Sequence, residues 1–143
     1  MFSKDEAKQL RQDFWVSFGK SYPRKWILYD TKIKDFSLKF HFDTSKAMVS
    51  IDIENKDLEK RIELWEKLIS LQSVLKNEYV PNVIFEEYTF LENQTEISRI
   101  YIKKERVSIH NKNTWQETML FLNDNMKKFE TFFRDFEDVI IDY

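Results

Sequence analysis

The sequence predicts one α+β domain with a mainly antiparallel sheet and helices packed on one face. Two observations lead to this fold class. The spacing of apolar residues switches between the helical and the strand period, and the strand-like segments come in consecutive runs. Across residues 1–143 the expected order is helix, three strands, helix, three strands, helix. Consecutive strands favour antiparallel pairing, either in one six-stranded sheet or in two three-stranded sheets.

The first helix is expected over residues 4–18. Ser3 and Glu6 have the spacing of a capping box, in which each side chain binds the free backbone N–H of the other residue. Gly19 suits the left-handed position after a helix, and Pro23 prevents the helix from continuing. Apolar residues recur at helical spacing and predict a buried stripe: Ala7, Leu10, Phe14 and Phe18.

Three strands are expected next, at residues 26–30, 36–42 and 47–54. The second and third alternate strictly between apolar and polar side chains, which indicates that each buries one face. If residues 43–46 form the loop of a hairpin, every apolar residue falls on the same face, whereas a shift by one residue would mix the faces. The resulting pairs are Phe42 with Ala47, Phe40 with Val49, and Leu38 with Ile51.

The second half of the chain shows the same succession of elements. Its helices have apolar residues at three-to-four spacing. The stripe from Trp115 to Phe136 also resembles a coiled-coil seam that could join two copies, but extra apolar residues beside it favour packing in the core. The expected elements are a helix at 57–78 capped by Asn55 or Asp57, strands at 84–91, 96–103 and 106–110, and a helix at 114–136.

Composition excludes several classes of site. The chain has no cysteine, which excludes disulfides, thiolate chemistry and cysteine zinc sites. Gly19 is the single glycine, so a P-loop, a dinucleotide-binding fingerprint and a nucleophile elbow are excluded as well. Apolar runs are too short to span a membrane, and the N-terminus lacks a signal core. We therefore expect a cytoplasmic protein without a membrane partner.

Several segments, taken in order, resemble the bacterial domain of unknown function 4268, and the resemblance covers nearly the whole chain. The residues that carry it are Phe14-Trp15, Ser17-Phe18-Gly19-Lys20, Trp26-Ile27-Leu28-Tyr29, Ile97-Ser98-Arg99-Ile100-Tyr101 and the late helix that begins at Trp115. Members of this family occur alone and also fused after nuclease-like domains. The resemblance therefore implies biology linked to DNA or to defence systems, and it implies no catalytic residue.

One enzymatic hypothesis is a metal-dependent nuclease of the restriction type. Such enzymes place an Asp near one strand and a Glu-x-Lys on the next, so that carboxylates hold Mg²⁺ and a lysine neutralises developing charge. Asp43, or else Asp52, together with Glu54 and Lys56, has this order. Asp43 and Glu54 belong to opposite ends of the hairpin, about 25 Å apart at about 3.3 Å per residue. Asp52 and Glu54 share a face that Asp35 could join, and a solvated strand edge is the alternative.

A binding hypothesis comes from the second run of strands. Folded as a meander, it places two polar rows opposite the apolar face: Tyr88, Arg99 and His110, and beside them Glu86, Tyr101 and Ser108. Rings and an arginine on an open sheet can stack on bases or bind a phosphate. Cross-strand contacts that only stabilise the sheet are the alternative, and a helix could cover this face. The two histidines lie in different hairpins, so no metal pair is predicted.

Net charge is −2, so no global basic field favours nucleic acid, although residues 20–39 and 99–112 are locally basic and residues 130–143 are acidic. We therefore expect a non-catalytic binding or accessory module without a cofactor, linked to nucleic acid or to defence systems. The partner would be nucleic acid or a protein, including a second copy of the chain. The alternative is the Mg²⁺-dependent nuclease.

Overall fold

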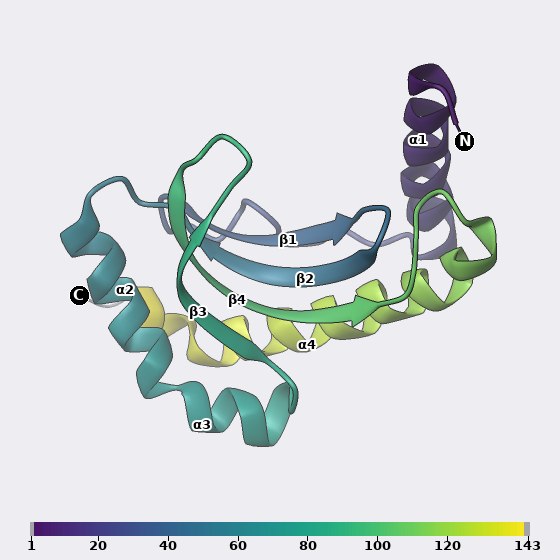
Figure 1. Ribbon diagram of the computed structural model, residues 1–143. Helices are drawn as coiled ribbons and strands as arrows, with labels where there is room; N and C mark the ends of the chain where they lie inside the picture. The colour runs from purple at the N-terminus through teal and green to yellow at the C-terminus, as the bar shows by residue number, and fades with distance from the viewer. Residues whose placement is uncertain (1, 142–143) are drawn as a thin grey trace.

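The computed structural model describes residues 2–141, and it confirms the α+β class. A four-stranded antiparallel sheet has the order β1-β2-β4-β3, with helices packed on it (Figure 1). The elements are α1 (Lys4–Ser21), β1 (Phe36–Phe42), β2 (Lys46–Ile53), α2 (Leu58–Ser70), α3 (Gln72–Val74) with the π-helical turn Leu75–Tyr79, β3 (Ile84–Phe90), β4 (Glu96–Glu105), the 3₁₀ turn Lys112–Thr114 and α4 (Trp115–Ile141).

The long helix α4 runs beneath the sheet and supplies much of the core (Figure 1). Its apolar stripe is buried inside the chain, as the sequence predicts for a core helix. The Phe133 ring packs 5.8 Å from that of Phe36 in β1. Buried residues of the stripe are Trp115, Met119, Leu122, Met126, Phe129 and Phe133, and the sheet opposes them with Phe36, Leu38, Val49, Ile51, Ile53 and Ile100.

Helix α1 stands at one end of the sheet, where the stripe Leu10, Phe14 and Phe18 is buried (Figure 1). The Phe14 ring lies 4.6 Å from that of Phe42 and 5.3 Å from that of Trp115. The predicted capping box of Ser3 and Glu6 is present. The prediction that Gly19 ends the helix in a left-handed conformation is wrong. The helix continues through Gly19 to Ser21, and the φ angle of Gly19 is not positive.

The β1–β2 hairpin has the predicted register. Leu38 opposes Ile51, and the two other predicted apolar pairs are also present. The turn is held by Asp43, whose Oδ1 accepts hydrogen bonds from the backbone N–H groups of Ser45 at 2.8 Å and Lys46 at 2.9 Å. Strict alternation and a short turn are sufficient to determine this pairing.

The expected strand at residues 26–30 is instead an irregular loop. The N–H of Ile27 donates to the Glu130 carboxylate of α4 at 2.6 Å, so it is not available to a neighbouring strand. Leu28 has a left-handed backbone, with φ of 46°, which a strand cannot contain. A tertiary contact therefore overrides the strand propensity of this aromatic-rich segment.

The expected strand at residues 106–110 is also absent. Strand β4 extends to Glu105, and Arg106 then turns the chain with φ of 64°. The buried side chains Val107 and Ile109 still enter the core, which explains their strand-like alternation. The sheet therefore has four strands rather than six. Of the helices in the described part of the chain, none is long and apolar enough to cross a membrane.

Candidate functional site

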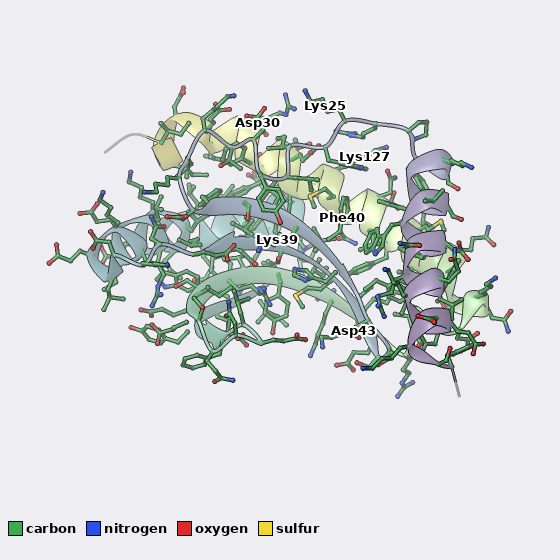
Figure 2. The ribbon with its side chains drawn as sticks, turned by 90° about the horizontal axis from the view of Figure 1, so that it is seen from above. Lys25, Asp30, Lys39, Phe40, Asp43 and Lys127 are labelled. Atoms are coloured by element: carbon green, nitrogen blue, oxygen red, sulfur yellow. The ribbon has the colours of Figure 1, made fainter. Side chains whose placement is uncertain are left out.

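The sheet face opposite α4 carries polar side chains from three strands: Lys39, His41, Ser50, Asp52, Arg99 and Tyr101, here called the open face. Within residues 2–141, no helix lies over the middle of this face (Figures 1 and 2). Several of its polar groups are nevertheless shielded from water, because the strand side chains pack over one another. Asp52 and Ser50 are fully buried.

Arg99 and Asp52 form the centre of the open face, and they oppose each other on adjacent strands. Arg99 donates two hydrogen bonds to Asp52, with Nε 2.7 Å from Oδ1 and a terminal nitrogen 2.8 Å from Oδ2. Lys39 Nζ lies 3.5 Å from Asp52 and 2.8 Å from Glu54. Burial disfavours the charged Asp52 carboxylate, but the hydrogen bonds and charge of Arg99 outweigh it and lower the pKa of this group.

His41 lies beside this pair, and its Nε2 is 2.8 Å from Ser50 Oγ. Burial, reinforced by the positive charge of Arg99, lowers the pKa of His41 from 6.5 to about 4. The imidazole is therefore neutral at pH 7, where it serves as a hydrogen-bonding partner inside the polar layer and not as a cation.

The structure brings together Glu86, Arg99 and Tyr101 among the predicted binding residues. Glu86 directly opposes Arg99 across β3 and β4, and Tyr101 Oη donates to the Glu86 carboxylate at 3.3 Å. Because Arg99 already holds Asp52 through Nε and one terminal nitrogen, a phosphate that binds this edge of the guanidinium would have to displace that carboxylate. These residues form a cross-strand network of the kind that stabilises a sheet.

The predicted row of Tyr88, Arg99 and His110 is wrong. The register shifts between Glu86 and Thr89, so Glu86 and not Tyr88 opposes Arg99. His110 follows the end of β4 in a turn, and its ring packs 5.3 Å from that of Phe2. Ser108 lies in the same irregular segment. A bulge in the β3–β4 pairing and the absence of a strand at residues 106–110, neither of which alternation reveals, separate the expected neighbours.

The carboxylates of the nuclease hypothesis lie in two places, as the hairpin geometry predicts. Asp43 forms the β1–β2 turn and pairs with Lys46 at 3.4 Å. Asp52 and Glu54 share the other end of the open face, where Lys39 bridges them. Among residues 2–141, no group of three or more histidines and carboxylates is placed to hold a metal ion. The acidic residues therefore do not fit a Mg²⁺ site as they stand.

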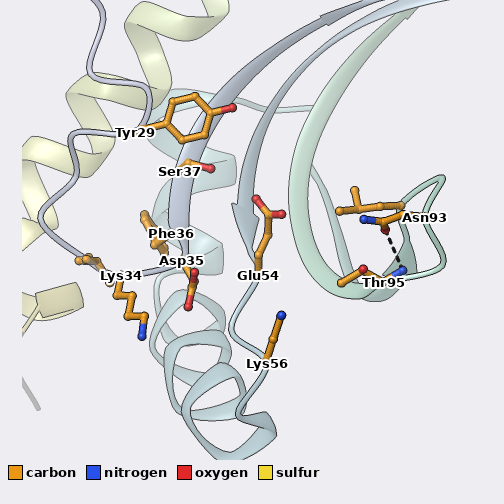
Figure 3. Close-up of a pocket in the computed structure, with 11 residues that line it drawn as sticks. Tyr29, Lys34, Asp35, Phe36, Ser37, Glu54, Lys56, Asn93 and Thr95 are labelled. Atoms are coloured by element: carbon orange, nitrogen blue, oxygen red, sulfur yellow. Dashed lines mark hydrogen bonds between the residues drawn. The ribbon is translucent and has the colours of Figure 1, made fainter.

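A cleft of about 520 Å³ opens where β2 ends, between the loop that precedes β1 and the β3–β4 turn (Figure 3). It is here called the Tyr29 cleft. Figure 3 shows Tyr29 at one rim, Lys56 and Glu54 inside, and Asn93 with Thr95 on the opposite wall. The residues that line it are Tyr29, Ile33, Lys34, Asp35, Phe36, Ser37, Glu54, Lys56, Leu91, Asn93 and Thr95.

The loop that carries Tyr29 has an unusual backbone. Leu28, Lys32 and Asp35 have φ of 46°, 66° and 59°, values that non-glycine residues seldom adopt. Thr31 stabilises the loop from within, because its buried hydroxyl contacts the carbonyls of Ile33 and Phe36. Strained segments that the rest of the fold maintains occur frequently at functional sites.

Tyr29 is the most exposed large hydrophobic side chain within residues 2–141, with 73% of its surface accessible. Its ring lies 5.9 Å from Lys39 Nζ, which links the cleft to the open face. The interpretation of residues 26–30 as a strand missed this feature. A loop assignment would have required knowledge of the contact with Glu130.

The walls of the cleft contain polar groups without partners. Ser37 Oγ is buried and makes no hydrogen bond within residues 2–141, one of two such side-chain atoms in that range. In the same part of the chain, neither Lys34 nor Lys56 has a carboxylate within 4.0 Å. Two available ammonium groups and an unused hydroxyl suit an anionic ligand.

Residues 10–137 match the family described as Domain of unknown function (DUF4268), which is nearly the whole chain. The chain belongs to this family. No curated protein and no solved structure matches it with significance. The expected family is thus confirmed, and the chain's own geometry must supply the argument about the function of this DUF4268 domain.

Proposed function

We propose that this DUF4268 domain is a non-catalytic binding module that holds single-stranded nucleic acid at the Tyr29 cleft. One observation carries the proposal: an exposed tyrosine on a strained loop stands at the rim of a cleft that contains unpaired lysines. Proteins that bind single strands without sequence preference combine aromatic platforms for bases with basic groups for the backbone.

Base stacking is the contribution expected of Tyr29. Its ring projects beside the sheet and is not covered by the core (Figure 3). Lys39 lies near the ring and is itself paired with Glu54, so it can fix the orientation of the ring without competing for the ligand. Stacking on one ring contributes about 1–3 kcal/mol per base.

Backbone binding is the contribution expected of Lys34 and Lys56. Both line the cleft below Tyr29, and Ser37 adds a hydroxyl donor on the same side. Asp35 and Glu54 also line the cleft, so its charge is mixed. Lys39 neutralises Glu54 at 2.8 Å, which leaves the lysines in slight excess. This balance favours a few phosphate contacts and a moderate affinity.

Fluorescence anisotropy with a labelled single-stranded oligonucleotide at several salt concentrations tests the proposal. Tyr29→Ala should weaken binding about tenfold, as the loss of one stacking platform predicts. Lys34→Gln and Lys56→Gln should each reduce the slope of log K against log salt by about 0.7, because each removes one phosphate contact.

Tyr88→Ala is the matched control, since Tyr88 is also an exposed tyrosine, 55% accessible, but lies on β3 outside the cleft. It should bind like the unaltered protein. Equal losses from Tyr29→Ala and Tyr88→Ala would show that the contact is nonspecific. An unaltered protein that binds no oligonucleotide at low salt would overturn the proposal, and a protein partner would then be the next candidate.

A Mg²⁺-dependent nuclease is the second candidate: Asp35, Glu54 and Lys56 line one cleft, but its two carboxylates would have to rearrange to bind Mg²⁺. The same oligonucleotide, incubated with Mg²⁺ and with EDTA, tests this alternative. A nuclease should release shorter fragments only with Mg²⁺, and Glu54→Ala should abolish the release. A binding module should leave the strand intact in both conditions.

A further inference from the structure

A second pocket lies between the loop that precedes β1 and one side of α2. It has a volume of about 260 Å³ and is here called the Asn55 pocket. It shares Ile33 and Lys34 with the Tyr29 cleft, but its other residues belong to the end of β2 and to α2. The residues that line it are Ile33, Lys34, Asn55, Lys60, Glu63, Leu64 and Lys67.

Asn55 provides the first indication of a ligand. Its side chain is only 7% exposed, and its Oδ1 is buried without a hydrogen-bond donor within residues 2–141. A buried amide oxygen without a partner is uncommon in a folded protein, because it has lost its water and gained nothing. The expected cap of α2 does not account for it, since Asp57 and not Asn55 caps that helix.

The charge around the pocket provides the second indication. Lys60, Glu63 and Lys67 project from α2 at positions that share one side of a helix, and Lys34 comes from the opposite loop. Lys34 and Lys60 against Glu63 leave an excess of positive charge. Lys67 also donates to the carbonyl of Ile140 at 3.3 Å, which ties this wall to α4.

The interior of the pocket has a third property, an apolar surface. Ile33 is buried in the loop, and Leu64 is buried on α2. A ligand that fits must therefore combine three features: an anionic group for the lysines, an apolar body for Ile33 and Leu64, and a donor for Asn55. A phosphate monoester carries a charge of about −1.5 to −2 at pH 7, so it can interact with both Lys34 and Lys60.

We propose that the Asn55 pocket binds a small phosphate monoester with an apolar body and an N–H or O–H donor. Lys34 and Lys60 hold the phosphate, Ile33 and Leu64 contact the body, and the donor satisfies Asn55 Oδ1 after a small turn of the amide. This site shares Ile33 and Lys34 with the Tyr29 cleft, but the proposal does not depend on nucleic-acid binding by that cleft.

NMR titration of the ¹⁵N-labelled chain with 4-aminophenyl phosphate tests the proposal. We expect saturable shifts of the backbone amides at residues 33–34, 55 and 60–67. Phenyl phosphate lacks the amine donor and should bind several-fold more weakly, since one hydrogen bond to a buried group is lost. Inorganic phosphate lacks the apolar body as well and should bind most weakly.

Variants locate the site. Lys60→Gln should weaken binding of 4-aminophenyl phosphate about tenfold, whereas Lys128→Gln, at an exposed lysine of α4 outside the pocket, should leave it unchanged. Asn55→Leu should abolish the preference for 4-aminophenyl phosphate over phenyl phosphate. It should also leave the thermal midpoint unchanged or raise it, because the lost oxygen has no partner in the free protein.

Equal weakening by Lys60→Gln and Lys128→Gln, or an absence of shifts at the pocket amides, would overturn the proposal. If Asn55→Leu does not fold, Lys60→Gln still decides the outcome. Tyr29→Ala separates this test from the previous one, since it should reduce oligonucleotide binding and leave 4-aminophenyl phosphate binding intact.

Discussion

The two faces of the sheet are both shielded from water, but by different means. On one face, α4 covers apolar residues such as Leu38 and Ile51, and side chains of two layers interlock. On the other face, Asp52 and Ser50 are equally buried, although no helix within residues 2–141 lies over the middle of that face (Figure 2). The charged groups of Arg99 and Lys39 contact the Asp52 carboxylate, at 2.7 Å and 3.5 Å, and help to shield it from water.

This difference teaches that burial and covering are separate properties of a sheet face. The stability of the covered face depends on how completely its apolar side chains fill the space between sheet and helix. Substitutions that leave a cavity should therefore destabilise it most. The stability of the open face depends on paired charges. A substitution that leaves one buried charge without its partner should therefore destabilise it most. The two proposed ligand sites lie at the margins of the open face, where the polar atoms Ser37 Oγ and Asn55 Oδ1 remain unsatisfied within residues 2–141.

The largest expected effect is on the covered face. Phe129→Ala should lower the free energy of unfolding by about 4 kcal/mol, because this fully buried ring of α4 would leave a cavity. Urea denaturation followed by circular dichroism measures the change. Leu120→Ala, at an exposed position of the same helix, should change the value by less than about 0.5 kcal/mol. Similar losses from both variants would contradict the assignment of the core.

On the open face, Arg99→Ala should lower the free energy of unfolding by about 3 kcal/mol, since it leaves the buried Asp52 carboxylate without its partner. The double variant Asp52→Leu/Arg99→Met should recover most of this loss in the same denaturation experiment. Lys103→Ala, which removes an exposed pair with Glu105, is the control and should have little effect. A double variant as unstable as Arg99→Ala would contradict the explanation.

Acidification should destabilise the open face in two separate steps. His41 has a pKa of about 4 in the folded chain and 6.5 when unperturbed, so the unfolded chain binds more protons between these values. Stability from this group is therefore nearly complete above pH 6.5 and should fall by about 3 kcal/mol as the pH decreases to 4.

Asp52 acts in a lower window, because its lowered pKa keeps it charged in the folded chain until the pH falls below 3.8. Thermal denaturation between pH 7 and pH 4 isolates the histidine, and His41→Gln should flatten the profile there. An unchanged slope in His41→Gln would assign the pH dependence to other groups.

The smallest effect on stability is expected at the edge of the open face. Tyr29→Ala should change the free energy of unfolding by less than about 0.5 kcal/mol, because the side chain is 73% exposed. Thermal denaturation measures this change. A marked loss of stability would mean that Tyr29 supports the strained loop. Weaker oligonucleotide binding by Tyr29→Ala would then reflect a disturbed fold and not the loss of a stacking platform.

The β1–β2 and β3–β4 hairpins differ in how far the alternation of apolar and polar residues determines their register. In β1–β2, every apolar residue except Met48 shares a face and Asp43 forms a compact turn, so the register was predictable. In β3–β4, a bulge after Glu86 shifts the pairing, and the exposed face of β3 does not penalise the shift. The partners of Arg99 were therefore not predictable from spacing.

The sequence by itself determined the α+β class, the first capping box, the β1–β2 register and the membership of α4 in the core. These features depend on local periodicity and on short-range hydrogen bonds. Only the tertiary structure decided that residues 26–30 form a loop, because Glu130 binds Ile27 across 103 positions of the chain. That contact places Tyr29 at the cleft, and the packing of the loop against α2 leaves Asn55 facing a pocket.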